Sequence, residues 1–279
     1  MKECAGSYFI RNGVTFPVDD FDNKMVYEGE SIYEVLRIVR GAPLFLGDHY
    51  ERLVNSIQNR KQPNLSTCDN LRRNIKTLAE IEKPNEVNLK IVFNYNSSKS
   101  AYLIYFIKTS YPSDKQYKEG VKGILFSAER TDPNSKVIQQ ELKSSIEARL
   151  AIEKAYEALL VNGKNFITEG SRSNIFFIKN ETIYTAPDSL ILGGITRKHL
   201  LGLCNETGIE VRYQCVKADE IQDYDSVLMS GTSPILLPFN QVDSRQFAVN
   251  DPTVEQLREM FMQKAEQSIN DFIQKIKGL

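Results

Sequence analysis

Short apolar runs alternate with polar ones along the chain, in the manner of strands that bury one or both faces. The strand-like runs are residues 14–18, 32–39, 44–46, 88–93, 101–107, 121–127, 166–170, 175–178, 182–185, 209–214 and 226–229. The runs 88–93 and 101–107 flank the polar loop NYNSSKS and predict a hairpin, and residues 41–43 predict a turn ahead of the run 44–46.

Longer segments carry apolar residues at the spacing of one helix face. They are residues 48–60, 68–81, 141–157, 196–207 and the segment from about 253 onward. In the first of them Leu53 and Ile57 lie four apart, and Asp48 is the expected N-cap. Pro84 and Gly208 are the expected stops of the second and fourth helices.

The segment YPSDKQYKEG, residues 111–120, is polar and contains Pro and Gly, which is typical of a connection between domains. We therefore predict an N-terminal α/β domain over 1–113, a linker over 114–120 and a C-terminal domain over 121–279. Strands and helices mixed in two unequal halves predict an α/β or α+β enzyme-like fold.

Composition narrows the class of protein. Of 279 residues, 41% are hydrophobic and 25% charged, the proportions of a folded globular protein rather than a disordered or fibrous one. Lysine and arginine number 35 against 36 aspartate and glutamate, so we expect no nucleic-acid partner bound through a basic surplus. No apolar run reaches the ~18 residues of a membrane span, and the start MKECAGSYFIRNG lacks the apolar core of a secretory signal, so we expect a cytoplasmic protein without membrane contact.

Cysteine and histidine usage limits the chemistry. The four cysteines at 4, 68, 204 and 215 form no CxxC pair, which predicts reduced thiols and no metal site. The only histidines are His49 and His199, and neither lies beside a GxSxG motif, so nothing points to a Ser-His-Asp mechanism.

Two glycine-containing segments have the form of anion-binding loops. In ILGGITRKHLL, residues 191–201, two glycines precede a helix start, where backbone N–H groups and the helix dipole attract an anion. In SGTSP, residues 230–234, Gly231 permits close backbone approach, and Thr232 and Ser233 offer hydroxyls. The alternative readings are a left-handed turn before a helix and a plain hairpin turn, respectively.

Glu169 and Arg52 are charged residues whose settings also have two readings each. Glu169 lies in TEGSRSNIFFI, residues 168–178, where a carboxylate either occupies a surface turn or points into a cleft toward a cation or a protonated ring nitrogen. Arg52 lies on the expected helix DHYERL beside Leu53, where it either faces solvent or binds a phosphate through its planar guanidinium.

The residues of these motifs and their order along the chain resemble those of one family. DHYERLVNSI, TEGSRSNIFFI, ILGGITR and DSVLMSGTSPILLPF together are similar to the fold-type IV pyridoxal-phosphate enzymes, the class IV aminotransferases, which include branched-chain aminotransferase, D-amino acid aminotransferase and aminodeoxychorismate lyase. SIYEVLRIVRGAPLF also resembles the N-terminal hairpin of that family, and the likeness runs from about residue 29 to residue 242. The resemblance implies two α/β domains, the cofactor pyridoxal 5'-phosphate in the crevice between them, and usually a homodimer.

The resemblance also implies a lysine bound covalently to the cofactor, and Lys136 and Lys143 are the candidates. In the family this lysine lies just over thirty residues before the glutamate of the TEG motif; Lys136 lies 33 residues before Glu169 and Lys143 lies 26 before it. We therefore expect Lys136. Gln139 and Glu141 stand where the family usually has asparagine and where branched-chain enzymes often have tyrosine, so the surroundings of the lysine depart from the common pattern.

Roles for the other motif residues follow from the same resemblance. Lys136 is expected to anchor the cofactor and to move the proton at the substrate Cα, and Glu169 to keep the pyridine nitrogen protonated. The expected phosphate ligands are Arg52, the backbone of Ile195 and Thr196, and the Thr232 hydroxyl.

Tyr33, Lys90 and Ser233 are the expected substrate-side residues. Lys90 stands on a strand where relatives often have a basic residue, and it either pairs with a substrate carboxylate or extends to solvent. Tyr33 is expected to line the pocket. The loop FNYNSSKS has neither the arginine nor the histidine that the D-amino acid enzymes use there, which argues against that specificity.

The sequence thus predicts a homodimeric class IV aminotransferase that moves an amino group between an amino acid, branched-chain ones among the candidates, and a 2-oxo acid. Two alternatives stay open. One is aminodeoxychorismate lyase, which uses the same cofactor to eliminate pyruvate. The other is a catalytically silent relative, against which the complete set of lysine, glutamate, arginine and threonine argues.

Overall fold

The computed structural model describes residues 2–96, 99–130 and 133–278. The chain forms two compact units: Met1–Ser110, Ser135–Ile138 and Gln263–Leu279 make the first, and Tyr111–Asn134 and Gln139–Met262 make the second. The predicted linker 114–120 contains helix α4 (Asp114–Glu119), which begins with a capping box at Ser113 and belongs to the second unit. Whether the continuous segments 1–113 and 121–279 fold as separate domains stays a prediction.

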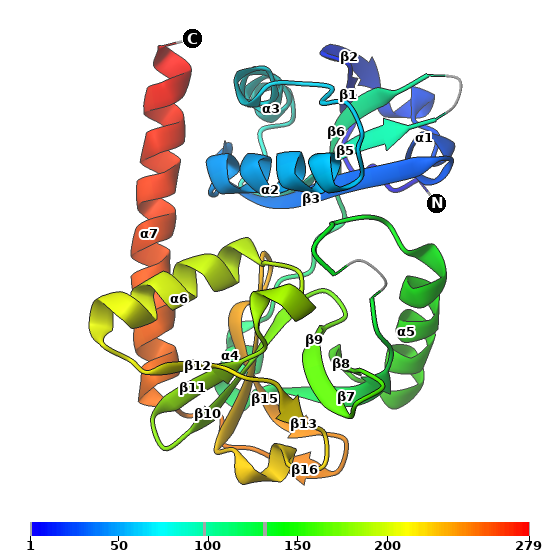
Figure 1. Cartoon of the computed structure of the whole chain (residues 1–279). Coiled ribbons are helices and arrows are strands. Elements are labelled where there is room, and N and C mark those ends of the chain that lie inside the picture. The colour runs from blue at the N-terminus through cyan, green and yellow to red at the C-terminus, as the bar shows by residue number, and fades with distance from the viewer. Residues whose placement is uncertain (1, 97–98, 131–132, 279) are drawn as a thin grey trace. The chain divides into compact units, whose positions relative to one another are not determined.

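The first unit is built on a six-stranded antiparallel sheet with the order β2-β1-β6-β5-β3-β4 (Figure 1). Its strands are β1 (Tyr8–Arg11), β2 (Val14–Pro17), β3 (Glu30–Val39), β4 (Ala42–Pro43), β5 (Glu86–Tyr95) and β6 (Ala101–Ile107). Its shorter helical elements are η1 (Val18–Asp20), α1 (Lys24–Tyr27), α2 (Leu46–Asn59) and α3 (Cys68–Glu82). The predicted hairpin is confirmed as β5 and β6, and residues 97–98 of its loop lie outside the described residues.

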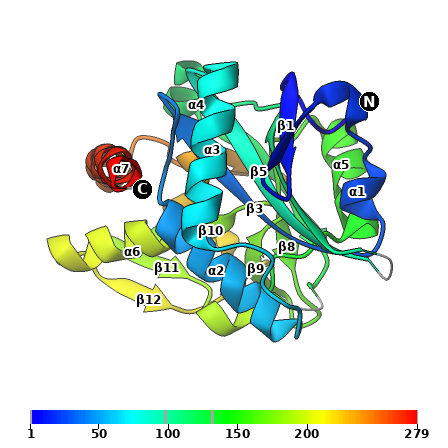
Figure 2. The same cartoon turned by 90° about the horizontal axis from the view of Figure 1, so that it is seen from above.

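Helices α2 and α3 cover one face of this sheet (Figure 2). Their buried residues recur at helical spacing, among them Leu53 and Ile57 on α2 and Leu71 and Ile75 on α3, and they pack with Leu36 of β3 in one core. The apolar face predicted for each helix from the sequence is therefore the face that is buried.

Two predictions at the start of α2 are wrong. Residues 44–46 form no strand, since the two-residue β4 lies earlier and Phe45 adopts a left-handed conformation with φ of 53°. The N-cap is Phe45 rather than Asp48, and the helix begins at Leu46. Leu46 belongs to the buried face of α2, so the apolar residues that suggested a strand are the first turn of the helix and its lead-in.

The second unit is built on a mixed ten-stranded sheet with the order β12-β11-β10-β14-β15-β7-β8-β9-β13, and β16 pairs with β15. Its strands are β7 (Val121–Ser127), β8 (Glu157–Val161), β9 (Phe166–Gly170), β10 (Asn174–Lys179), β11 (Thr182–Thr185), β12 (Val211–Tyr213), β13 (Val216–Lys217), β14 (Ser226–Gly231), β15 (Ile235–Val242) and β16 (Arg245–Gln246). Its other helical elements are α5 (Gln140–Glu153), η2 (Asp188–Leu190), α6 (Ile195–Thr207) and η3 (Ile221–Asp223).

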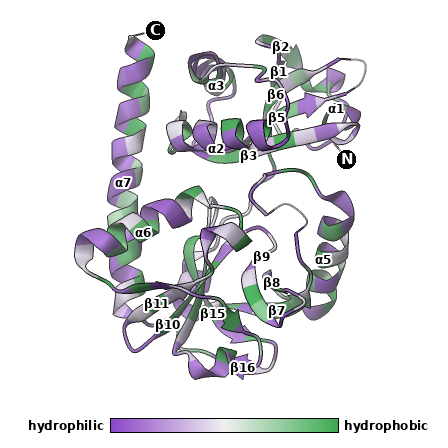
Figure 3. Ribbon diagram, viewed as in Figure 1, coloured by the Kyte–Doolittle hydropathy of each residue, from purple (hydrophilic) through white to green (hydrophobic). Residues whose placement is uncertain are grey.

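The helix predicted over 141–157 is confirmed only in its first part. Helix α5 ends at Glu153, Lys154 takes a left-handed conformation, and the chain enters β8 at Glu157. All five residues of β8 are buried, so this short apolar run is a central strand rather than the end of an amphipathic helix. Figure 3 shows hydrophobic and hydrophilic residues mixed along α5.

The last helix, α7 (Pro252–Lys277), begins in the second unit and continues into the first, where Ala265, Ile269 and Phe272 join the core of α2 and α3. Among the described residues, no helix combines the length and the apolar composition that crossing a membrane requires.

Candidate functional site

Lys136 lies on a short segment of the first unit that attaches to β3. Val137 forms an antiparallel bridge with Ile32, and the N–H of Tyr33 donates to the carbonyl of Lys136 at 3.0 Å. The N–H of Lys136 donates in turn to Oγ of Ser56 on α2, at 3.3 Å. Backbone contacts to a strand and to a helix thus hold this lysine in place.

The ring of Tyr33, on β3, lies near two lysines that were predicted to be site residues, Lys136 and Lys90. Nζ of Lys136 lies 4.8 Å from the centroid of the Tyr33 ring, and Nζ of Lys90 on β5 lies 4.9 Å from it. Both are within the distance of a cation–π interaction. Lys90 does not extend to solvent: its side chain is 7% exposed and pairs with Glu3 at 2.7 Å. The structure thus gathers Lys136, Tyr33 and Lys90 in one neighbourhood.

Arg52 and His49, both on α2, bind the carboxylate of Glu34 on β3. Nε and Nη2 of Arg52 donate to Oε1 and Oε2 of Glu34 at 2.8 Å and 2.6 Å, and Nδ1 of His49 lies 2.7 Å from Oε2. The side chain of Arg52 is only 13% exposed. The reading of Arg52 as a solvent-facing helix residue is therefore wrong.

The charge of Glu34 is maintained by its partners. Burial by itself would raise the pKa of Glu34, but the charge and hydrogen bonds of Arg52, with those of His49, lower this pKa to about 2. Burial lowers the pKa of His49, and Glu34 opposes that shift. An ionised carboxylate only accepts hydrogen bonds, so Nδ1 of a neutral His49 carries the proton and donates it.

Glu34 and His49 were missed by the sequence reasoning, although both carry a signal. Glu34 directly follows Tyr33 in the strand motif and therefore faces the opposite side of the sheet, toward α2. His49 stands three residues before Arg52, the spacing of neighbours on one helix face. These local signals mark the three residues, but their pairing depends on the packing of α2 against β3, which the sequence alone does not give.

In the second unit, Glu169 is a buried carboxylate at the end of β9. The residue is 3% exposed, its Oε2 accepts the N–H of Leu192 at 3.3 Å, and its Oε1 lies 3.0 Å from Nε of Arg130. The reading of Glu169 as a surface turn residue is wrong. Arg130 carried no sequence signal, because it belongs to an irregular segment with no periodic pattern.

The turn that follows Glu169 explains why the TEGSRSN motif contains a glycine and two serines. The hydroxyls of Ser171 and Ser173 both donate to the fully buried carboxylate of Glu157 on β8. A Cβ at Gly170 would overlap Oγ of Ser173, so a larger residue there would displace the hydroxyl that donates to Glu157. The two serines and the glycine therefore fix the turn against Glu157, and this turn sets the end of the strand that carries Glu169.

The loop ahead of α6 has the predicted form of an anion site. Gly194 is the N-cap, with φ of −68° and no side chain of its own to cap the helix, so the reading as a left-handed turn is wrong. A Cβ on Gly194 would overlap Oδ1 of Asn174, whose Nδ2 donates to the carbonyl of Leu192 at 2.8 Å. Ile195 and Thr196, in the first turn, are buried.

Thr232 and Ser233 lie in the turn between β14 and β15, so the hairpin reading of SGTSP describes its geometry correctly. Just before the turn, Ser230 pairs in register with Asn174 of β10, the residue that holds the loop ahead of α6. The hydroxyl of Ser230 is buried, with no hydrogen-bond partner among the described residues. The two predicted anion-contacting loops are thus connected through the pairing of the adjacent strands β10 and β14.

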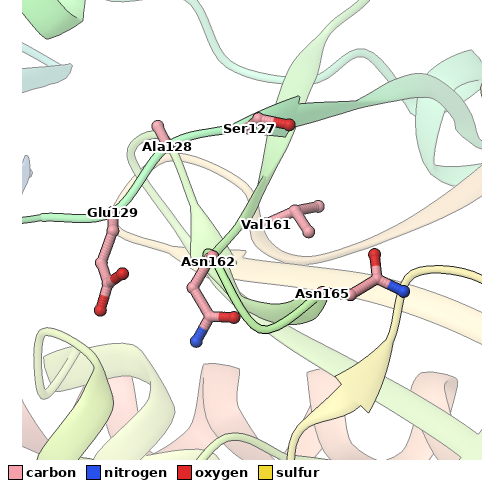
Figure 4. Close-up of a pocket in the computed structure, with 7 residues that line it drawn as sticks. Ser127, Ala128, Glu129, Val161, Asn162 and Asn165 are labelled. Carbon is pink, nitrogen blue, oxygen red and sulfur yellow. The ribbon is translucent and has the colours of Figure 1, made fainter.

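A hollow of about 450 Å³ elsewhere in the second unit is formed by the end of β7 and the turn between β8 and β9 (Figure 4). Its lining consists of Ser127, Ala128, Glu129, Val161, Asn162, Gly163 and Asn165. None of these described residues is a predicted site residue.

Comparison with known proteins decides the family. The family model of the class IV amino-transferases matches residues 31–242, most of the chain. The chain belongs to the class IV aminotransferases. Members of this family are pyridoxal-phosphate enzymes, and the resemblance seen in the motifs is confirmed.

Two relatives of this aminotransferase cover most of both chains. The D-alanine aminotransferase of Bacillus licheniformis is 25% identical over 250 residues, which are 84% of this chain and 86% of the relative. The branched-chain-amino-acid aminotransferase of Escherichia coli strain K12 is 28% identical over 245 residues, 79% of each chain. Both relatives are named aminotransferases, so this protein is an enzyme of that family.

The fold is confirmed by a solved structure. The crystal structure of the Escherichia coli branched-chain amino acid aminotransferase superposes with a TM-score of 0.81 at 22% identity, covering 92% of this chain and 94% of that one. The predicted mixed α/β, fold-type IV architecture is therefore correct.

Each unit contains groups whose chemistry suits a part of the family's cofactor. An uncapped helix start at Gly194 suits a phosphate dianion, and the buried carboxylate of Glu169 suits a protonated ring nitrogen. In the first unit, Lys136 supplies an amine held by its backbone.

Proposed function

We propose that this aminotransferase moves an amino group between an amino acid and a 2-oxo acid with pyridoxal 5'-phosphate as its cofactor. One observation carries the proposal. In the second unit, buried Glu169 accepts the N–H of Leu192, three residues before the start of α6 at Ile195. A carboxylate for a ring cation therefore lies close to a helix start for a phosphate.

Pyridoxal 5'-phosphate, when bound, supplies an electron sink for the charge that develops at the substrate Cα. Lys136 would hold the cofactor covalently; once the amino group of the substrate replaced it there, the free amine of Lys136 would move the proton at Cα as a general base. Glu169 keeps the proton on the ring nitrogen, because a nearby negative charge favours the protonated form. Lys136 is preferred to Lys143 because Lys143 lies on the exposed face of α5, paired with Glu147 at 3.8 Å.

The phosphate is assigned to Arg52, the backbone N–H groups of Ile195 and Thr196, and the Thr232 hydroxyl. Arg52 is supported by its rigid hold on Glu34, which orients a guanidinium before a ligand binds. The helix-start amides need no charge of their own, because the dipole of α6 favours an anion there.

Substrate contacts are assigned to Tyr33, Lys90 and Ser233. Tyr33 and Lys90 are supported by their closeness to Lys136, and Ser233 by its position next to Thr232 in the β14–β15 turn. Branched-chain amino acids and D-alanine are the first donors to test, because the names of the relatives point to them. A homodimer in the cytoplasm is also proposed, and four free cysteines agree with a reducing compartment.

A substrate screen tests this function. Purified protein loaded with cofactor should form a new amino acid when L- or D-alanine, valine, leucine or glutamate is mixed with pyruvate or 2-oxoglutarate. Aminodeoxychorismate in the same screen separates the lyase, which releases pyruvate without a 2-oxo acceptor. Pyruvate release with no amino transfer from any donor would contradict the proposal.

A further inference from the structure

Glu3, near the start of the chain, is bound by two side chains of the first-unit sheet. Its Oε1 lies 2.7 Å from Nζ of Lys90 on β5, and its Oε2 accepts a hydrogen bond of 3.0 Å from the hydroxyl of Tyr105 on β6. Oδ1 of Asn23 accepts the N–H of Glu3 at 2.9 Å. Both carboxylate oxygens and the backbone are therefore held in place.

This ion pair lies close to the lysine that is proposed to react. Because the Nζ atoms of Lys90 and Lys136 lie 4.9 Å and 4.8 Å from the same Tyr33 ring centroid, they are less than about 10 Å apart. The side chain of Lys90 is 7% exposed and that of Glu3 is 19% exposed, so the carboxylate is the more accessible member of the pair.

We propose that Glu3 determines substrate specificity: by neutralising Lys90, it makes the enzyme select amino acids and 2-oxo acids with uncharged side chains over dicarboxylic ones. The inference rests on the proposed function, in which Lys136 acts at the substrate Cα. A lysine ammonium without a partner at this distance would attract a second carboxylate. With Glu3 in place, an incoming carboxylate meets a negative charge and has to displace an ion pair that Tyr105 also holds.

A purely structural role for the pair predicts something different. If Glu3 only tethered the start of the chain, its loss would lower stability and activity toward all substrates alike. The preference for one substrate class over another would not change. Relative specificity is therefore the quantity to measure.

Glu3→Gln keeps the size of the side chain and its hydrogen-bonding capacity but removes the charge. In the half-reaction of the cofactor-loaded enzyme with single amino acids, the second-order rate constant for glutamate or aspartate should rise relative to that for norvaline or alanine. We expect this ratio to rise about tenfold or more, the scale of one charge-assisted hydrogen bond. An unchanged ratio would overturn the proposal.

Binding gives a second readout that needs no turnover. Calorimetric titration of the cofactor-loaded enzyme should show glutarate binding to Glu3→Gln about tenfold more tightly than to the wild type, with butyrate unchanged. A wild type that transfers no amino group would contradict the proposed function, whereas equal glutarate affinity in the two proteins would contradict the role of Glu3.

Two further variants separate charge at Lys90 from loosening of the chain start. Glu82→Ala is the control for loosening, because it removes the Oε1 that accepts the N–H of Tyr8 at 2.7 Å and holds the same segment. It should leave the ratio unchanged, and a rise equal to that of Glu3→Gln would overturn the proposal. In the double variant Glu3→Gln with Lys90→Met the gain should disappear; a gain that persists would mean that Lys90 is not the cation concerned.

Discussion

Glu34 on β3 holds Arg52 on α2 through two contacts, from Nε to Oε1 at 2.8 Å and from Nη2 to Oε2 at 2.6 Å. Glu34 is fully buried, so its carboxylate has no alternative orientation in solvent. A bidentate pair of this kind sets the plane of the guanidinium. The strand thereby orients the arginine that is proposed to bind phosphate.

Arg52→Ala should weaken cofactor binding about ten- to a hundredfold, because a charge-assisted bond to a phosphate is worth about 1.5–3 kcal/mol. It should also destabilise the fold by about 3–5 kcal/mol, since Glu34 is left buried without its partner. Fluorescence titration with the cofactor and urea unfolding measure the two effects. Adding Glu34→Gln should restore most of the stability but not the affinity, and unchanged affinity in Arg52→Ala would contradict the phosphate role.

Acidification should destabilise the first unit through His49 and Glu34. The pKa of His49 is lowered from 6.5, so the unfolded chain binds a proton there that the folded chain refuses, and stability falls as pH drops below about 6.5. Glu34, with its pKa lowered from 4.5 to about 2, adds stability above pH 4.5 that is lost as pH falls toward 2. Urea unfolding between pH 8 and pH 5 measures how the free energy of unfolding falls with pH. This fall should be shallower in His49→Asn than in the wild type, and an equal fall in the two proteins would contradict the role of His49.

Lys136→Ala should abolish the visible absorbance of lysine-bound cofactor and nearly all turnover, because both the anchor and the proton-moving amine are removed. Borohydride reduction of the wild type and peptide mapping should place the pyridoxyl group on Lys136. Lys143→Ala is the control and should behave as the wild type. A label on Lys143 would show that the choice of lysine is wrong.

Glu169→Gln should leave cofactor binding largely intact but slow the removal of the Cα proton. We expect the activation free energy of this step to rise by several kcal/mol, the amount that a preorganised charge typically contributes. The amide keeps the size of the side chain but no longer favours a protonated ring nitrogen. Single-turnover absorbance after mixing with an amino acid measures this step. Wild-type decay rates would remove Glu169 from the mechanism.

Gly194→Ala should disturb the start of α6, because its Cβ would overlap Oδ1 of Asn174. We expect a loss of about 1–3 kcal/mol in unfolding free energy, typical of overpacking, together with weaker cofactor binding. Gly193→Ala is the matched control, since a Cβ there meets no atom within 4 Å. Thermal unfolding and cofactor titration of the two variants compare them directly, and equal losses would contradict a specific role for Gly194.

Local pattern was sufficient for most of the elements. The hairpin of β5 and β6, helix α3 over Cys68–Glu82 and the end of α6 before the left-handed Gly208 all follow from periodicity and turn residues within a few positions. The predictions fail where two kinds of structure share one apolar run, as at Leu46 and Glu157, because period alone does not separate a buried strand from a helix turn.

The sequence by itself determined which residues are candidates for the chemistry, since the TEGSRSN and GGITR motifs point to Glu169 and the helix start at Ile195. Only the tertiary structure decided what those residues face. Glu34 meets Arg52 across 18 positions and Glu3 meets Lys90 across 87, and no local pattern records such distances. Ion pairs of this kind form because a folded sheet excludes water from both partners at once, and burial of a charge is tolerated only where an opposite charge is already in place.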